Sequence, residues 1–232
     1  MDASFLRTAI RKLSNPSSRE SVEMDTFVVL GGGGHAKVLV AVLKRLGHVV
    51  IGYSDLQDCG AILGVPYLGD DEALWKAVRE GLRSKAAIGV GKVDLSEARV
   101  RLASDVLSQG LELPVIVSPR ATVNEEVRLG DAVVVLDGAV MNSGTVADRL
   151  CIFNTNSTVE HDCRIGENVH VAPGATISGG VTIGSNCLIG AGATLIQGIT
   201  ICAHCLIGAG STVIDDLVVP GTYAGNPARR IR

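Results

Sequence analysis

The strongest constraint on the fold is an apolar residue at every sixth position from Val117 to Val219. Hydrophobic residues make up 47% of the chain, so eighteen apolar residues in this register would arise by chance about once in a million trials. A helix repeats near every 3.6 residues and a strand alternates every two, so neither explains the period. The positions are Val117, Val123, Leu129, Val135, Met141, Ala147, Phe153, Val159, Ile165, Val171, Ile177, Ile183, Ile189, Leu195, Ile201, Ile207, Val213 and Val219.

This repeat predicts a parallel β-helix. Each hexad would form one short strand and a turn, and three hexads would complete one triangular coil. The aliphatic side chains would fill the prism, while successive coils would share backbone hydrogen bonds at a spacing of about 4.8 Å. Aromatic residues are only 3% of the chain, which suits a core of aliphatic side chains. The repeat is long enough for between five and six coils.

A second, smaller inward position follows each aliphatic residue by four, and it accounts for most of the cysteines. Cys151, Cys163, Cys187 and Cys205 all occupy this position. We therefore expect buried, reduced thiols that behave as small apolar residues, with neither a disulfide nor a metal site. Cys59 and Cys202 remain outside the register, and we expect no partner for either.

The part of the chain before the repeat alternates strand-like and helix-like segments, which predicts a small parallel sheet with helices on its faces. We expect a Rossmann-like domain over residues 25–116, a β-helix over residues 117–232, and an N-terminal extension of unassigned role over residues 1–24. Strands are expected at 27–30, 48–53 and 86–90, and helices at 35–46, 71–83 and 95–109.

Charge and hydropathy exclude several classes of partner. The net charge of −3 gives no reason to expect nucleic acid or an anionic membrane surface. No apolar run approaches the roughly 18–20 residues of a membrane span. The first 24 residues lack the apolar segment and cleavage site of a secretory signal, so we expect a cytoplasmic protein.

A run of four glycines, Gly31–Gly34, follows the first expected strand and precedes the first expected helix. Such a loop presents backbone N–H groups and a helix N-terminus to an anion. Together with Asp55 after the second strand, it partly matches a dinucleotide-binding fingerprint. The small number of strands disfavours a complete NAD-binding domain, but that alternative stays open.

Three segments carry a family resemblance: Gly31–Lys37 (GGGGHAK), Asn154–Asp162 (NTNSTVEHD) with His170 beyond it, and Gly225–Arg229 (GNPAR). Through them, residues 25–232 resemble the hexapeptide-repeat sugar acyltransferases of the sialic-acid O-acetyltransferase type. That group includes N-acetyltransferases of nucleotide-linked 4-amino-4,6-dideoxy sugars, as in bacillosamine and perosamine synthesis. The resemblance implies a left-handed β-helix, a homotrimer, acetyl-CoA as co-substrate and no metal.

His161 is the expected general base. It stands at the third position of its hexad, away from the inward sites, and histidine is the natural base near neutral pH. An adjacent carboxylate would orient the ring and stabilise the imidazolium. Asp162 is the first candidate and Glu160 the second. The family often carries Glu at the position of Asp162.

The remaining site residues are implied by the resemblance alone. Acetyl-CoA would be contacted by His170, by the Gly179 N–H as an oxyanion donor, and by small residues along the coenzyme groove, Ala191 and Ala209. The nucleotide sugar would be bound by residues of the glycine loop, the ends of two strands and the start of the second matched segment. These are Gly33, Gly34, His35, Ser54, Asp55, Gly91 and Asn154.

Three functions follow from these observations. The first is acetyl-CoA-dependent N-acetylation of the 4-amino group of a nucleotide-linked sugar. The second is O-acetylation of a sugar such as sialic acid, and the third is a non-catalytic hexapeptide scaffold. The glycine loop and the Ser54-Asp55 pair favour the first, because a free sugar needs no contact to a base. The sequence leaves the nucleotide (UDP, dTDP or GDP), the sugar and the acyl-chain length open.

Overall fold

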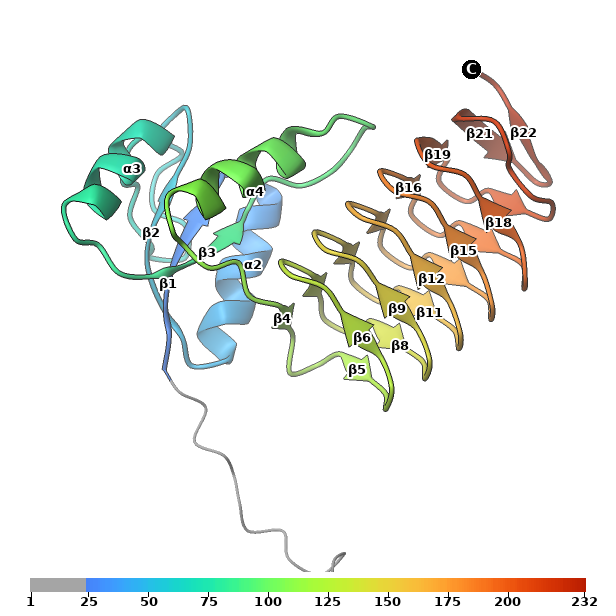
Figure 1. The fold of residues 1–232 in the computed structure, drawn as a ribbon, viewed down its shortest axis with the longest axis horizontal. Helices are drawn as coiled ribbons and strands as arrows, with labels where there is room; N and C mark the ends of the chain where they lie inside the picture. The colour runs from blue at the N-terminus through green and yellow to red at the C-terminus, as the bar shows by residue number, and fades with distance from the viewer. Residues whose placement is uncertain (1–23) are drawn as a thin grey trace, which may run out of the picture.

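The computed structural model describes residues 24–232, so the extension expected at residues 1–24 lies outside the described residues apart from Met24. An N-terminal α/β domain is followed by a long solenoid of short parallel strands (Figure 1). The predicted fold class, a Rossmann-like domain joined to a left-handed parallel β-helix, is confirmed.

The N-terminal domain holds a three-stranded parallel sheet in the order β2-β1-β3. The helix expected over residues 71–83 ends earlier, at Arg79, because Gly81 adopts a left-handed conformation with φ of 111°. The elements are β1 Thr26–Leu30, α2 Gly34–Arg45, β2 Val49–Ser54, α3 Asp71–Arg79, β3 Lys85–Ile88 and α4 Ala98–Ser108.

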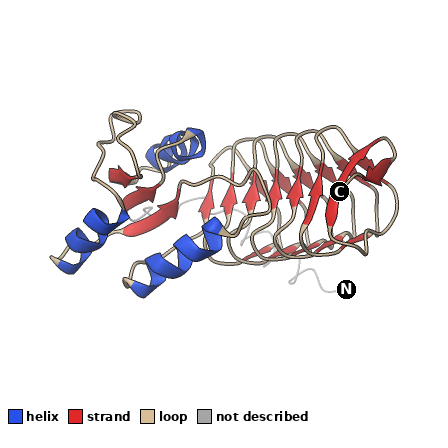
Figure 2. Cartoon of the chain, turned by 90° about the horizontal axis from the view of Figure 1, so that it is seen from above, coloured by secondary structure: helices blue, strands red, loops and turns tan. Residues whose placement is uncertain are grey.

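The sheet is covered by helices on both faces (Figure 2). Side chains along β1 alternate between the two faces, as the strand period requires. Phe27 and Val29 belong to one buried cluster with Leu39 of α2. Val28 and Leu30 belong to the other, together with α3 and α4. Every position of β1 after Thr26 is therefore buried, and the central strand has no solvent-facing side.

The solenoid repeats strands of two residues, apart from the three-residue strand β19, and the last residue of each is the apolar residue of the hexad. Its strands are β4 Ile116–Val117, β5 Thr122–Val123, β6 Arg128–Leu129, β7 Val134–Val135, β8 Val140–Met141, β9 Val146–Ala147, β10 Ile152–Phe153, β11 Thr158–Val159, β12 Arg164–Ile165, β13 His170–Val171, β14 Thr176–Ile177, β15 Thr182–Ile183, β16 Leu188–Ile189, β17 Thr194–Leu195, β18 Thr200–Ile201, β19 Cys205–Ile207 and β20 Thr212–Val213. Every third strand pairs in parallel, so the prism has three faces, namely sheets of eight, six and five strands.

The register holds through Val213 and then fails, so the prediction for Val219 is wrong. Val219 is 47% exposed, while Leu217 is buried and pairs with Ile201. Tyr223 likewise stands opposite Ile207, two residues earlier than the repeat requires. The last coil is shortened because the chain turns into an antiparallel hairpin, β21 Gly221–Gly225 and β22 Ala228–Arg230, which extends the eight-stranded sheet at the far end.

Each corner of the prism carries one residue in the left-handed conformation, and these residues stack from coil to coil. At the corner between the six- and five-stranded sheets they are Glu126, Gly144, Asp162, Gly180 and Gly198. Glycine adopts this conformation without steric cost, whereas other residues carry some strain. Asp162 is therefore a carboxylate at a position that three of its four column neighbours fill with glycine.

The cysteine prediction is confirmed for four residues and wrong for one. Cys151, Cys163, Cys187 and Cys205 are buried in the prism as expected. Cys202 was expected to lack a partner, but its Sγ lies 3.5 Å from the Sγ of Cys205. The C-x-x-C spacing of these two cysteines is the sequence signal for that contact. The thiols within residues 24–232 are free.

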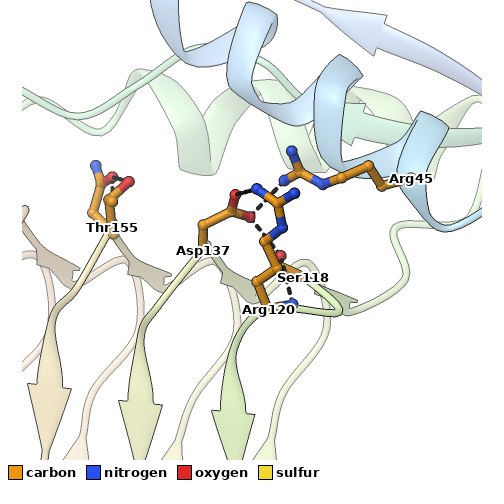
Figure 3. Close-up of polar contacts among 6 residues, drawn as sticks. Arg45, Ser118, Arg120, Asp137 and Thr155 are labelled. Carbon is orange, nitrogen blue, oxygen red and sulfur yellow. Dashed lines mark hydrogen bonds and ion pairs between the residues drawn. The ribbon is translucent and has the colours of Figure 1, made fainter.

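The two domains are joined by polar contacts at two places along the solenoid, near Asp137 and near Asn186. Arg45, at the end of α2, forms an ion pair with Asp137 at 2.5 Å, and Ser118 and Arg120 approach the same carboxylate (Figure 3). The loop between β3 and α4, residues 89–97, contacts the solenoid through Lys92, whose ammonium is buried and donates to Asn186 Oδ1 at 2.6 Å. These contacts fix α2 and this loop against the β-helix.

Candidate active site

The predicted catalytic pair is formed in the structure. His161 Nδ1 lies 2.9 Å from Asp162 Oδ2, and both side chains are exposed at the corner of the coil. The carboxylate accepts at Nδ1, so the neutral imidazole presents the lone pair of Nε2. That nitrogen has no partner within residues 24–232 and is available to a substrate proton.

The structure also decides between the two candidate carboxylates. Glu160 Oε2 accepts a hydrogen bond from Asn142 Nδ2 at 2.9 Å, and Asn142 in turn accepts from Asn124. These three side chains form a ladder one coil apart along the six-stranded sheet. Glu160 is thereby held away from the imidazole, which leaves Asp162 as the partner of His161.

Gly179 lies directly beside the imidazole on the next coil. A Cβ at Gly179 would stand 2.5 Å from His161 Nε2 and 2.7 Å from its Cε1, so only glycine leaves room for the ring. Within the described residues, the Gly179 N–H donates to no acceptor. The predicted oxyanion donor and the predicted base are thus brought together at one corner.

His170 is buried in the eight-stranded sheet, beneath the loop that carries Lys92. Its Nδ1 lies 2.6 Å from the Lys92 carbonyl oxygen, and its Nε2 lies 3.0 Å from Asn154 Nδ2. Asn154 Oδ1 accepts from the Thr155 N–H, so its amide nitrogen faces the ring. His170 is therefore a neutral imidazole that donates at Nδ1 and accepts at Nε2. Burial lowers its pKa to about 4, and the nearby Lys92 and Arg99 charges add to this effect.

His35 and Gly91 lie at the same junction between the domains. Burial lowers the pKa of His35 to about 3, with further lowering by the positive charge of Arg99 and by the neighbouring His170, which opposes a second proton at this junction. A Cβ at Gly91 would touch the His35 Cβ at 3.4 Å. The His35 Nε2 is buried and makes no hydrogen bond with any described residue. His35 and Gly91, two predicted sugar-binding residues of the first domain, thus lie close to His170 of the β-helix.

The glycine loop is closed by the strand end that follows it. The Gly32 N–H donates to Asp55 Oδ2 at 2.5 Å, and the Gly31 N–H donates to the Ser54 carbonyl at 2.7 Å. Ser54 itself is fully buried and donates its hydroxyl to Asp71. Asp55 therefore holds the loop with Oδ2, while its Oδ1 accepts a long hydrogen bond from the Gln57 N–H at 3.4 Å.

Two open pockets flank this loop. The first, of about 340 Å³, has Gly31, Ser54, Asp55, Leu56, Asp71, Val90, Ala98, Arg101, Leu102 and Asp105 on its walls. The second, of about 330 Å³, lies at the start of α2 and is lined by Gly32, Gly33, Gly34, Lys37, Cys59, Ala61, Ile62 and Leu63. Gly33 caps α2 without a side-chain hydrogen bond, which leaves the first N–H groups of the helix open to an anion.

One chain does not gather all the predicted residues. His161, Asp162 and Gly179 lie at the corner between the six- and five-stranded sheets, whereas His170 belongs to the eight-stranded sheet. Ala191 and Ala209 are exposed and stack at the corner between the eight- and six-stranded sheets.

The sequence reasoning missed the residues that join the two domains, Lys92, Asn186 and Arg99. Arg99 is fully buried on α4, and its guanidinium donates to the Val90 carbonyl. A signal existed for Asn186 alone, since Asn168 and His204 stand exactly one coil before and after it.

A coiled hexapeptide array with an exposed imidazole–carboxylate pair at one corner, preceded by an α/β domain, defines a hexapeptide-repeat acyltransferase. Comparison with known families agrees in both parts of the chain. Residues 26–102 match the PglD N-terminal domain family, and residues 180–215 match the bacterial transferase hexapeptide family (six repeats). The chain belongs to the hexapeptide-repeat sugar acyltransferases, in the group that contains the perosamine N-acetyltransferases, and it is an acyltransferase.

Three relatives illustrate the similarity. GDP-perosamine N-acetyltransferase of Escherichia coli O157:H7 is 33% identical over 170 residues, which cover 69% of this chain and 73% of the relative. Perosamine N-acetyltransferase of Caulobacter crescentus, solved as a histidine variant with CoA and GDP-perosamine, superposes with a TM-score of 0.84 at 36% identity, over 88% of this chain and 96% of that one. The acetyltransferase domain of PglB from Neisseria gonorrhoeae FA1090, solved with acetyl coenzyme A, gives 0.82 at 31% identity, over 90% and 100%.

Within residues 24–232, no helix combines the length and apolar character needed to cross a bilayer.

Proposed function

We propose that the protein is an acetyl-CoA-dependent N-acetyltransferase that acts on the 4-amino group of a nucleotide-linked amino-deoxysugar, with His161 as general base. The observation that carries this proposal is the His161–Asp162 hydrogen bond of 2.9 Å, with the free Nε2 beside Gly179. The relatives support the substrate class, since one was solved with CoA and GDP-perosamine and another with acetyl coenzyme A.

The chemistry follows from this geometry. His161 Nε2 accepts a proton from the sugar amine as the amine nitrogen forms its bond to the thioester carbonyl carbon. Asp162 stabilises the imidazolium that results. The Gly179 N–H donates to the oxyanion. The carbon–sulfur bond then breaks, and the thiolate of CoA leaves with the proton that the imidazolium returns.

The acceptor is bound by the N-terminal domain in this proposal. The diphosphate lies at the open N-terminus of α2, against the backbone of Gly33 and Gly34. Asp55, which lines the adjoining pocket and whose Oδ1 makes only a long bond to the Gln57 N–H, accepts from a ring N–H of the base. His35 and Asn154 face the sugar from the two sides of the domain junction.

The distribution of these residues supports a homotrimer. The His161 corner and the residues that join the two domains lie on different parts of one prism. We infer that neighbouring copies complete the site, with acetyl-CoA between two prisms against Ala191 and Ala209. Light scattering tests the assembly. At a nucleotide-sugar concentration below the KM of Asp55→Ala, mixed trimers of a His161→Asn chain and an Asp55→Ala chain should be more active than either chain alone.

The central experiment measures thiol release from acetyl-CoA with a panel of UDP-, dTDP- and GDP-linked 4-amino sugars and with free sialic acid. We expect turnover with one nucleotide amino sugar and none with sialic acid. Turnover with sialic acid alone would establish O-acetylation instead. Absence of transfer to any acceptor would favour a scaffold role.

The same assay tests the base. His161→Asn should lower kcat by about 100-fold or more, because general-base catalysis contributes on that scale. His48→Asn, a histidine of the N-terminal domain away from the corner, is the control. Turnover of His161→Asn close to that of the wild-type protein would remove His161 from the mechanism.

A further inference from the structure

Gly144 lies one coil before Asp162 in the same corner column, directly beneath its carboxylate. A Cβ at Gly144 would stand 2.5 Å from Asp162 Oδ1 and 3.4 Å from its Cγ. The first distance is shorter than the closest approach of a carbon and an oxygen atom that are not bonded to each other. The Asp162 carboxylate therefore occupies the space that any side chain at Gly144 would fill.

We propose that Gly144 is a positioning residue, whose missing side chain lets the Asp162 carboxylate lie against His161. The inference rests on the proposed function of His161 as the base. It adds a residue whose nearest neighbour is Asp162 and which acts on His161 through that carboxylate.

The backbone conformation alone does not require glycine at Gly144. Its φ is 77°, but Glu126 and Asp162 adopt φ of 64° and 59° in the same column. This corner therefore accepts residues with a Cβ. The close approach of the carboxylate separates Gly144 from Gly198, where φ is 72° and a Cβ would meet nothing within 4 Å.

The two coils cannot move apart to admit a side chain at Gly144. The Asp162 N–H donates to the Ser143 carbonyl at 3.1 Å. On the other side of Gly144, the Thr145 hydroxyl donates to the Glu160 carbonyl at 2.8 Å and accepts from the Cys163 N–H at 3.3 Å. These bonds fix the spacing of the coils, so the movable group is the exposed carboxylate.

Displacing the carboxylate would impair the base without removing it. Asp162 holds His161 through Oδ2, while Oδ1 lies over Gly144. A methyl group at Gly144 would turn the carboxylate toward solvent and break the bond to Nδ1. The imidazole would then lose its fixed orientation. It would also lose its preference for the tautomer that is protonated at Nδ1 and has a free lone pair on Nε2. Because Gly144 acts through Asp162 in this proposal, substrate binding should be unaffected.

The test compares Gly144→Ala with Gly198→Ala, which has the same left-handed backbone and open space around the Cβ. We expect Gly144→Ala to lower kcat by about 10-fold or more, as small displacements of catalytic groups do. The KM values for both substrates should stay within about twofold, and Gly198→Ala should match the wild-type protein within about twofold. An equal loss in both variants would show a general cost of altering the corner.

A double-mutant cycle separates positioning from a structural effect. In an Asp162→Ala background, Gly144→Ala should change kcat by less than about twofold, because the overlapping carboxylate is gone. The same fractional loss in both backgrounds would overturn the proposal. Nitrogen NMR of the histidine side chains gives a second measurement, in which the Nδ1-protonated form of His161 should lose its dominance in Gly144→Ala. If His161→Asn retains full activity, the proposed base fails, whereas the effect of Gly144 on Asp162 is still read by NMR.

Discussion

Mild acid should weaken the contact between the two domains, because two histidines at that junction are buried in their neutral form. The pKa of His170 is lowered to about 4 and that of His35 to about 3, chiefly by burial. An exposed histidine in the unfolded chain titrates near 6.5. Arg99 lies close to both rings and opposes the arrival of a further positive charge.

The direction and size of the effect follow from this difference. Both folded pKa values lie below the unfolded value, so the unfolded chain binds more protons in mild acid. The stabilisation is complete above about pH 6.5 and is lost as the pH falls toward the folded values. Between about pH 7 and pH 5, each histidine should remove about 2 kcal/mol from the free energy of unfolding.

Urea unfolding measured by tryptophan fluorescence tests this prediction. Trp75 is the only tryptophan in the chain, and it is buried in the N-terminal domain. The comparison variant is His170→Asn, which keeps an amide donor for the Lys92 carbonyl but does not titrate. The wild-type protein should lose about 2 kcal/mol more than the variant between the two pH values. Equal losses would refute the assignment of His170 as a buried neutral base.

Two further predictions concern the residues that shape the junction and the loop. Asn186→Ala should lower the free energy of unfolding by about 3 kcal/mol, because the buried Lys92 ammonium loses an acceptor and alanine takes a left-handed backbone; urea titration checks this, and an unchanged midpoint would contradict it. Asp55→Ala should raise the KM for the nucleotide sugar about 10-fold with kcat little changed, because the Gly32 N–H loses its charged acceptor. Steady-state kinetics measure this, and an effect on kcat alone would exclude the proposed binding role.

The sequence predicted the solenoid closely because its core is periodic and is built from contacts between residues 18 apart in sequence. Each aliphatic residue is repeated one coil away, so a single register determines every strand through Val213. The error at Val219 has a physical cause. The last coil must end the stack, and the chain does so with Tyr223 and an antiparallel hairpin instead of another hexad.

The contacts between the domains were not predictable in the same way. Lys92 meets Asn186 across 94 residues of sequence and His170 across 78, and no short motif encodes such pairs. The sequence ranked Asp162 before Glu160, but the exclusion of Glu160 depends on its bond to Asn142 one coil away. By contrast, His161 and Asp162 are neighbours in sequence, so their pairing could be predicted from the motif itself.

The loop of residues 89–97 and the adjoining start of α4 contact the solenoid at two points that are a fixed number of coils apart. Arg99 reaches the Leu150 carbonyl, and Lys92 and Leu95 reach Asn186, two coils further along. A coil inserted between Leu150 and Asn186 would move these two residues about 4.8 Å further apart. The loop and α4 could then no longer make both sets of hydrogen bonds. Beyond Asn186, no hydrogen bond or ion pair from residues 25–116 reaches the solenoid. Among related chains, gain or loss of whole coils should therefore fall near the C-terminal end, where the solenoid can change its length without disturbing the junction.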